Sequence, residues 1–178
     1  MTFRRKANRL PPASYEGGIY FVIISCDRRA AYFAQAKRAE WCAKHLLACA
    51  QMAGADLLAY TIMPDHVHLL VAQYHGTLPA LVRTFKQVTG FHFKKDTGQG
   101  LWQKGYYDHV IRKEEDLAEI ALYIAANPVR RALVVDWQAY EFTGGSLLAR
   151  DAAPHPAPGN LKVAATLAAA HHSNEAPA

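Results

Sequence analysis

Short runs of β-branched and aromatic residues alternate with segments of helical periodicity along most of this chain. The runs predict strands at residues 18–26, 56–63, 66–73 and 106–112. Apolar residues recur at helical spacing over 35–53, 78–95 and 114–126, which predicts three helices. Gly54, Gly98 and the Asn127-Pro128 pair are expected to end these helices. A further extended segment is expected over residues 134–142.

The order strand, helix, two strands, helix, strand, helix is typical of the split β-α-β arrangement. We therefore expect an α+β, ferredoxin-like fold in which one antiparallel sheet carries its helices on a single face. A chain of 178 residues can bury one core, so residues 17–149 are expected to form one domain. Residues 1–16 are expected to be a basic arm, and residues 150–178, which are rich in Ala and Pro, a disordered tail.

Two histidines begin the third expected strand, in the sequence Asp65-His66-Val67-His68. Alternate side chains of a strand share a face, so His66 and His68 are expected on one side with Cα atoms about 6.6 Å apart. At this separation two imidazoles can bind one metal ion, and they can equally face solvent. Asp65 either orients His66 or serves the turn before the strand.

Tyr123 is the second candidate for chemistry. It lies about 100° around the third expected helix from the apolar stripe that begins at Leu117. Glu119 and Asn127 lie one helical turn to either side of it, so the three residues are expected to form a polar stripe beside the core. Tyr123 is then either a half-buried packing residue or a phenol nucleophile.

Composition narrows the class of protein. Hydrophobic residues make up 51% of the chain and charged residues 20%, and no apolar run is long enough to cross a membrane. The basic N-terminus lacks an apolar segment behind it, so no secretory signal is expected. Three cysteines without a Cys-x-x-Cys pair favour a reduced, cytoplasmic setting. The net charge of +5, clustered at residues 4–9, 94–95, 112–113 and 130–131, favours a polyanionic partner.

Three blocks of sequence together resemble the REP-associated tyrosine transposases, which belong to the single-tyrosine HUH endonucleases. They are His66-Val67-His68, residues 102–112 (WQKGYYDHVIR) and residues 123–130 (YIAANPVR). The similarity runs from about residue 15 to 147. One departure follows the last block, where the family's Gly-Leu-Val is replaced by Arg131-Ala132-Leu133-Val134. Loss of that glycine is expected to alter the turn after the helix and to leave the catalytic set intact.

The resemblance implies an endonuclease and strand transferase acting on single-stranded DNA. Such an enzyme cleaves and rejoins DNA near hairpin-forming palindromic repeats through a 5′-phosphotyrosine intermediate. Tyr123 is implied as the nucleophile. Mg²⁺ or Mn²⁺ is implied as the cofactor, with His66, His68 and Asn127 as its ligands. Since free tyrosine has a pKa of about 10, the metal, a basic neighbour or a proton acceptor must assist the attack.

Other residues are expected around this site. Asp65, Glu119 and His109 are candidates for supporting roles, although Glu119 is equally a surface glutamate and His109 a bystander on its strand. Tyr106 and Tyr107 are candidates for stacking on unpaired bases, whereas Trp102 is expected in the core. Basic residues expected to contact DNA are Arg4, Arg5, Lys94, Lys95, Lys104, Arg112, Arg130 and Arg131.

The resemblance also favours a monomer over a dimer, and a cytoplasmic, nucleoid-associated bacterial protein without membrane contact. Two other functions fit the same residues. A non-catalytic nucleic-acid-binding module on this fold would use the basic groups without cleavage. A metallohydrolase would use water as the nucleophile and would not need Tyr123.

Overall fold

The computed structural model describes residues 16–112 and 116–148. The expected basic arm and tail, including Arg4 and Arg5, therefore lie outside the described residues, apart from the first residue of β1. The elements follow the expected order, and their bounds are β1 Glu16–Ser25, α1 Ala36–Met52, β2 Ala55–Met63, β3 His66–Thr77, α2 Leu78–Thr97, β4 Tyr107–Val110, α3 Leu117–Ala125, α4 Asn127–Arg130 and β5 Thr143–Gly144.

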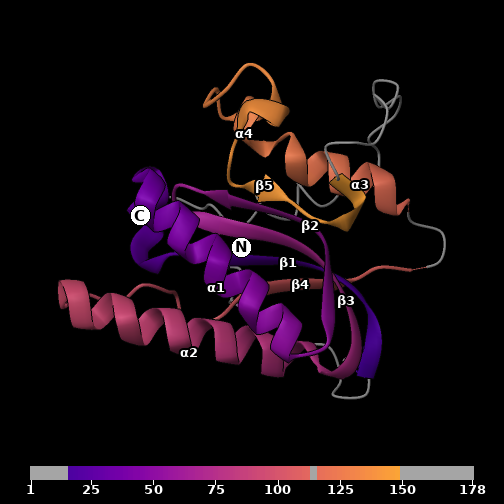
Figure 1. Cartoon of the computed structure of the whole chain (residues 1–178), viewed down its shortest axis with the longest axis horizontal. Helices are drawn as coiled ribbons and strands as arrows, with labels where there is room; N and C mark the ends of the chain where they lie inside the picture. The colour runs from indigo at the N-terminus through magenta and orange to yellow at the C-terminus, as the bar shows by residue number, and fades with distance from the viewer. Residues whose placement is uncertain (1–15, 113–115, 149–178) are drawn as a thin grey trace, which may run out of the picture.

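One five-stranded sheet has the order β4-β1-β3-β2-β5, and its pairs are all antiparallel (Figure 1). β3 lies between β1 and β2, so α1 connects two strands that are not neighbours. α2 likewise connects β3 to β4 across β1. This is the split β-α-β arrangement, and the expected antiparallel α+β fold is confirmed.

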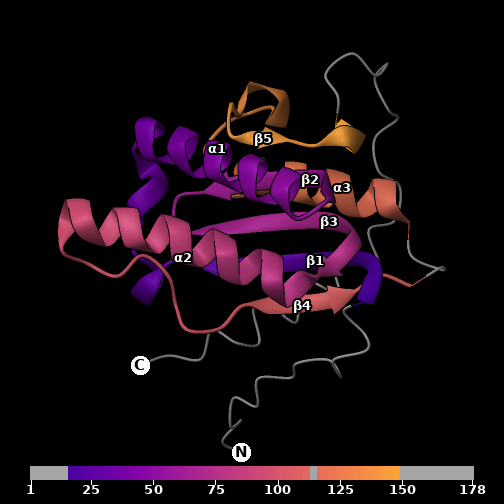
Figure 2. The ribbon, with the colours of Figure 1, turned by 60° about the horizontal axis from the view of Figure 1, so that its bottom comes forward.

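The helices cover both faces of the sheet (Figures 1 and 2). α1 and α2 pack on the face that presents Val22, Val67 and Leu69. α3 packs on the opposite face, against Phe21 and Leu70. The expectation of helices on a single face is therefore wrong for α3. The physical reason is that β1 and β3 are apolar on both sides, as strands covered on both faces are.

The end of the sheet at which β1 ends and β3 begins is here named the histidine end. Several backbone contacts hold it together. Cys26 N–H donates to the Asp65 carbonyl oxygen at 2.8 Å, and Gln103 N–H donates to that of Ser25 at 3.0 Å. Lys86 Nζ donates to the carbonyl oxygens of residues 103, 104 and 105 at 2.6, 3.2 and 2.9 Å. The loop before β4 is therefore fastened to both β1 and α2.

The segment after α4 differs from expectation. Residues 134–142 are not an extended strand; they contain the 3-10 turn Trp137–Ala139, and pairing with β2 begins only at β5. The Asp136 side chain accepts a hydrogen bond from Gln138 N–H at 3.0 Å, and such a local bond favours a turn over a strand.

The cysteines are buried free thiols. Burial raises the pKa of Cys26 to about 12 and also raises the pKa values of Cys42 and Cys49. These thiols therefore stay protonated at neutral pH. In the part of the chain that the structure describes, no helix has the length and apolar character needed to cross a membrane.

Candidate functional site

His66 and His68 lie on the face of β3 that α3 covers. Their side chains are buried, at 2% and 1% exposure, and do not face solvent. The Nε2 atoms of the two rings are 2.8 Å apart. The strand therefore brings the two ring nitrogens to one point beneath α3, as the alternation of side chains predicts.

A chain of polar contacts fixes His66. Its Nδ1–H donates to Asp65 Oδ1 at 2.6 Å, and Asp65 Oδ2 pairs with Arg29 Nε at 3.0 Å. Arg29 Nη1 then donates to the Oγ of Ser25, the residue paired with His66 on β1, at 3.0 Å. Asp65 thus orients His66 as well as standing in the turn. Arg29 is a member of the site that sequence analysis missed, because it comes from a loop whose course the sequence pattern does not predict.

The charges of the residues in these polar contacts are complementary. Burial lowers the pKa of His66 below its ordinary value, although the hydrogen bond to Asp65 opposes that shift. Burial raises the pKa of Asp65, but the bond to His66 and the charges of His66, Arg29 and Arg131 together hold it below its usual range. At neutral pH His66 is therefore neutral and Asp65 ionised. With the proton on Nδ1, the lone pair on Nε2 points toward His68.

α3 places the ring of Tyr123 beside His68. The ring centroid of Tyr123 is 6.5 Å from that of His68 and 6.3 Å from that of Phe21. Tyr123 is only 6% exposed, so it belongs to the core between α3 and the sheet and not to a polar stripe beside that core. The Arg130 guanidinium carbon lies 4.8 Å from the ring centre, within the range of a cation–π contact.

The C-terminal end of α3 is tied to the sheet through one carbonyl oxygen, that of Ile124. It accepts a hydrogen bond from Thr61 Oγ1 at 3.1 Å. Thr61 is the residue that β2 pairs with His68. Asn127 Nδ2 donates to the same oxygen at 3.3 Å and to the carbonyl oxygen of Tyr123 at 2.9 Å. Sequence analysis missed Thr61, because its position beside His68 depends on the register of two strands.

The donor set fits a small divalent ion. Two nitrogen ligands at right angles, each about 2.1 Å from an ion, are about 3.0 Å apart, close to the observed 2.8 Å between the Nε2 atoms. Among the described residues, no group of three His, Cys, Asp or Glu side chains can hold a metal ion. Any third protein ligand from the described residues would then be a neutral oxygen. Asn127 offers Oδ1, because its Nδ2 is bonded to the end of α3.

The basic residues expected to contact DNA are divided between the two ends of the sheet. Arg131 is close enough to the site for its charge to lower the pKa of Asp65. Lys104 lies in the loop fastened to Ser25, and therefore at the histidine end. Arg112 follows β4 at the far end, because β4 begins opposite Ile23 and ends opposite Tyr20.

The remaining candidates come from β4, the first turn of α3 and the loop before β4. His109 is paired with Phe21 and lies two residues along β4 from Tyr107, which is paired with Ile23. Glu119 is in the first turn of α3, at the end away from Thr61. Trp102 packs against Phe33 and Phe85, with ring centroids 5.5 Å apart in each case, and its expected core position is confirmed.

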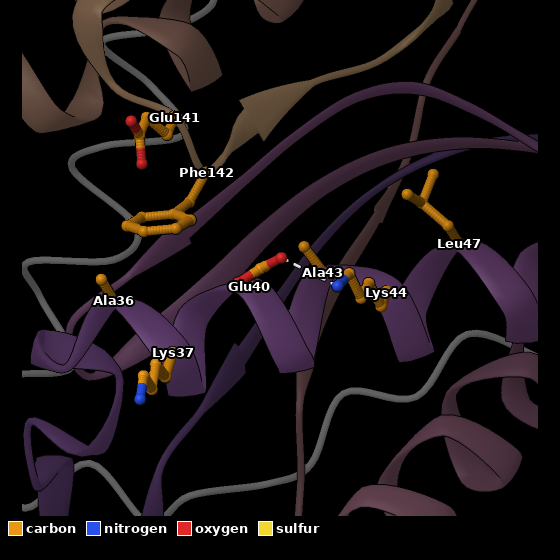
Figure 3. Close-up of a pocket in the computed structure, with 8 residues that line it drawn as sticks. All are labelled: Ala36, Lys37, Glu40, Ala43, Lys44, Leu47, Glu141 and Phe142. Carbon is orange, nitrogen blue, oxygen red and sulfur yellow. Dashed lines mark ion pairs between the residues drawn. The ribbon is translucent and has the colours of Figure 1, made fainter.

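A pocket lies away from these residues, between α1 and the segment that precedes β5 (Figure 3). Glu141 and Phe142 line one side, and side chains of α1 line the other. It contains none of the residues predicted from the sequence to be functional.

Comparison with known proteins identifies the family. The model of the family described as "Transposase IS200 like" matches residues 14–127, which is more than half of the chain. The chain belongs to the IS200-like transposases. Membership of this family makes it a DNA-cleaving enzyme of the transposase kind, as the resemblance implied.

Individual relatives of this transposase are consistent with this family. A Haemophilus influenzae protein named as a REP-associated tyrosine transposase is 29% identical over 143 residues, which cover 68% of this chain and 78% of that protein. An uncharacterized protein of the same organism is 25% identical over 159 residues, covering 70% and 88%. The solved structure of a REP-associated tyrosine transposase bound to a REP hairpin matches with a TM-score of 0.65 at 20% identity, covering 90% of this chain and 93% of that one. This structural likeness supports the fold.

Proposed function

We propose that this transposase is an endonuclease and strand transferase for single-stranded DNA, which cleaves and rejoins DNA near hairpin-forming repeats. One observation carries the proposal. Tyr123 lies beside His68, whose Nε2 atom is 2.8 Å from that of His66. A nucleophile beside a convergent pair of nitrogen ligands is an arrangement suited to phosphodiester chemistry.

In the proposed reaction, Tyr123 Oη attacks the phosphorus atom of a DNA phosphodiester. A bond forms between the phenol oxygen and phosphorus while the bond to the 3′-oxygen breaks. The phenol proton is given up and the leaving 3′-oxygen gains one, so that a 3′-hydroxyl and a 5′-phosphotyrosine result. One phosphodiester is exchanged for another, so attack by a 3′-hydroxyl reverses the step and rejoins the strands.

His66 Nε2, His68 Nε2 and Asn127 Oδ1 would hold Mg²⁺ or Mn²⁺. When bound, the ion would supply polarisation of a phosphodiester oxygen and orientation of the scissile group. Asp65 keeps the proton of His66 on Nδ1, so that Nε2 is available as a ligand. Two imidazoles favour Mn²⁺ over Mg²⁺, because Mg²⁺ prefers oxygen ligands.

The surroundings of the site support a DNA substrate. Arg130 lies over the Tyr123 ring, and the charge of Arg131 acts on Asp65 and His66. Both cations come from the segment that follows α3, and both are exposed. We infer that these two cations neutralise DNA phosphates near the scissile bond. Tyr107, which shares this face of the sheet with Phe21 at a ring distance of 6.2 Å, offers an aromatic surface for an unpaired base.

The test is formation of a covalent adduct. The protein is incubated with a library of single-stranded DNA hairpins with flanking strands, in the presence of Mn²⁺, and analysed on a denaturing gel. We expect a denaturation-resistant protein–DNA adduct with the wild type and none with Tyr123→Phe, which lacks only the nucleophilic oxygen. Tyr74→Phe is the matched control, because Tyr74 is exposed near the far end of β3.

Two other outcomes would overturn the proposal. Hairpin binding without any adduct, on DNA selected for tight binding, would indicate a non-catalytic binding module. Cleavage that survives in Tyr123→Phe but is lost in His66→Ala would indicate a metallohydrolase that uses water.

A further inference from the structure

We propose that the stem of the hairpin lies against a basic rim at the histidine end, formed by Arg28, Lys37, Arg38, Lys94 and Lys95. These side chains come from the loop after β1, the first turn of α1 and the last turn of α2. The inference rests on the proposed function and assigns one part of its DNA substrate to one surface of the protein.

The charge of the chain is concentrated in the two helices that provide this rim. α1 and α2 contain seven Lys and Arg residues and two acidic residues, a net charge of +5. The formal charge of the whole chain is also +5, so the rest of the sequence is balanced. The helical layer, and not the face that bears Tyr123, therefore carries the excess of positive charge that attracts DNA.

The direction of the chain brings rim cations from both helices to the histidine end. β3 starts at that end with His66, and α2 returns to it, so Lys94 and Lys95 lie there. α1 starts at the same end, since it follows the loop after β1, so Lys37 and Arg38 also lie there. The Arg38 guanidinium carbon is 5.5 Å from the ring centre of Phe93, which places the first turn of α1 beside the last turns of α2.

The rim is continuous with the catalytic face. Tyr32, in the loop before α1, packs on Phe93 with ring centroids 4.7 Å apart, and its hydroxyl donates to Gln99 Oε1 at 3.0 Å. In the same loop, Phe33 N–H donates to the carbonyl oxygen of Pro64, two residues before His66. A strand cut near its hairpin would thus pass from the tyrosine around this end of the sheet, where the rim meets the adjoining stem.

The rim cations are available to phosphates. Among the described residues, Lys37, Lys94 and Lys95 form no ion pair with a carboxylate. Lys37 extends from α1 away from Phe142 (Figure 3). Arg28 Nε lies 3.9 Å from Asp27 Oδ2, a long contact, and the Arg28 side chain is 92% exposed. Lys44 differs, because it is paired with Glu40 at 2.8 Å on the same helix.

Two further features fit a hairpin. The residue before α1 gives no side-chain cap to the helix, so the first backbone N–H groups of α1 can add to the attraction for phosphate. Phe91 is 68% exposed and lies one turn before Lys94 and Lys95 on the same side of α2. Its ring can stack on an unpaired base where a stem ends, which a continuous duplex does not provide.

The experiment compares two DNA ligands by fluorescence anisotropy over a series of salt concentrations. One is a hairpin with its flanking single strand, and the other is the flanking strand alone. We expect the double variant Lys94→Ala/Lys95→Ala to weaken binding of the hairpin and to make the slope of log affinity against log salt less negative by about 1.8. Lys37→Ala is expected to change that slope by about 0.9. Binding of the flanking strand should weaken much less.

Arg83→Ala and Lys44→Ala are the matched controls. Arg83 is exposed in the first half of α2, far from the histidine end, and Lys44 is neutralised by Glu40. Two results would contradict the proposal that the rim binds the stem. One is an unchanged slope of log affinity against log salt for the hairpin in the rim variants, and the other is an equal loss of affinity for the flanking strand. Adduct formation is scored separately: a rim that binds stems in a protein that forms no adduct would overturn the proposed chemistry alone.

Discussion

The carbonyl oxygen of Ile124 is the atom through which the sheet positions the tyrosine helix. Thr61 reaches it from β2, and Asn127 reaches it from the end of the helix. The same contact therefore sets where Tyr123 lies and which atom of the Asn127 amide faces away from α3. Thr61 acts through these residues and is a positioning residue in the proposed reaction.

Replacing Thr61 by Val removes the hydroxyl and keeps the shape of the side chain. We expect adduct formation to slow by about tenfold or more, since small displacements of reacting groups are costly, while hairpin affinity stays near the wild-type value. Thr61→Ser, which restores the hydroxyl, should recover the rate. Thermal melting should show a loss of about 1 kcal/mol in the free energy of unfolding for Thr61→Val.

Thr143→Val provides the matched comparison for Thr61→Val. Thr143 Oγ1 lies 3.0 Å from Thr61 Oγ1 but makes no bond to Ile124. We expect a similar loss of stability without the loss of rate. Equal effects of the two variants on the rate would mean that Thr61 contributes only to stability.

Asp65 offers a test of the metal site that does not depend on activity. Asp65→Asn removes the charge that keeps the proton on Nδ1 of His66, so we expect Mn²⁺ affinity to fall by about 10–100-fold. Calorimetric titration of the DNA-free protein with Mn²⁺ measures this. Asp56→Asn is the control, because Asp56 accepts from Ser146 Oγ at the far end of β2 and should leave the affinity unchanged. Equal affinities for all three proteins would exclude Asp65 from the metal site.

At the scale of elements, α4 ends in a turn that usually requires glycine. Leu133 N–H donates to the Pro128 carbonyl oxygen and Ala132 N–H to that of Val129, both at 2.9 Å, which is the Schellman pattern. Ala132, the residue after the C-cap Arg131, has a φ of 53° and lies in the left-handed region. Ala132 stands in the segment in which, by the resemblance, Arg131-Ala132-Leu133-Val134 replaces the family's Gly-Leu-Val. The turn is therefore retained here in spite of the substitution, at the cost of strain.

A glycine at position 132 should relieve that strain. We expect Ala132→Gly to raise the free energy of unfolding by about 0.5–1 kcal/mol, because the relief exceeds the added entropy of the unfolded chain. Urea denaturation measures the change. Ala48→Gly, at an exposed position inside α1, should lower the same quantity by about 1 kcal/mol. Destabilisation by both variants would contradict the strain at Ala132.

Helices and strands were predictable from the sequence wherever the pattern that indicates them lies within a few neighbouring residues. The alternation of side chains around His66 and His68 follows from two residues of spacing, and the capping glycines mark the ends of α1 and α2. Placement of α3 was not predictable in the same way. Its apolar stripe shows that one side is buried, but which face of the sheet it covers depends on the path of the chain. Tyr123 was accordingly expected beside the core and lies within it.

At the scale of the whole molecule, the sheet lies between two helical layers that carry different features. The layer of α3 holds the candidate chemistry, and the layer of α1 and α2 holds the excess charge. Neither Thr61 nor Arg29 could be identified from sequence, because each meets its partner through the register of strands or through a loop. The candidate ligands and nucleophile, in contrast, stand in motifs whose order along the chain is informative by itself.

This architecture predicts that one chain supplies a complete site. A mixture of Tyr123→Phe and His68→Ala proteins should form no adduct, because Tyr123 lies beside His68 of its own chain. A dimer that exchanges tyrosine helices would restore activity in the mixture. Size-exclusion chromatography of the wild type, with and without hairpin DNA, should show a monomer if the mixture is inactive.

The attachment of α3 to Thr61 has a consequence for how products are chosen. In the proposed reaction a severed 5′ end stays bonded to a tyrosine whose helix is hydrogen-bonded to the sheet, so the protein is the holder of that end. The 3′ end is then the exchangeable partner. Which strands become joined would be settled by competition among the 3′ ends that reach the holder, and adding an excess of one such end should redirect the products toward it.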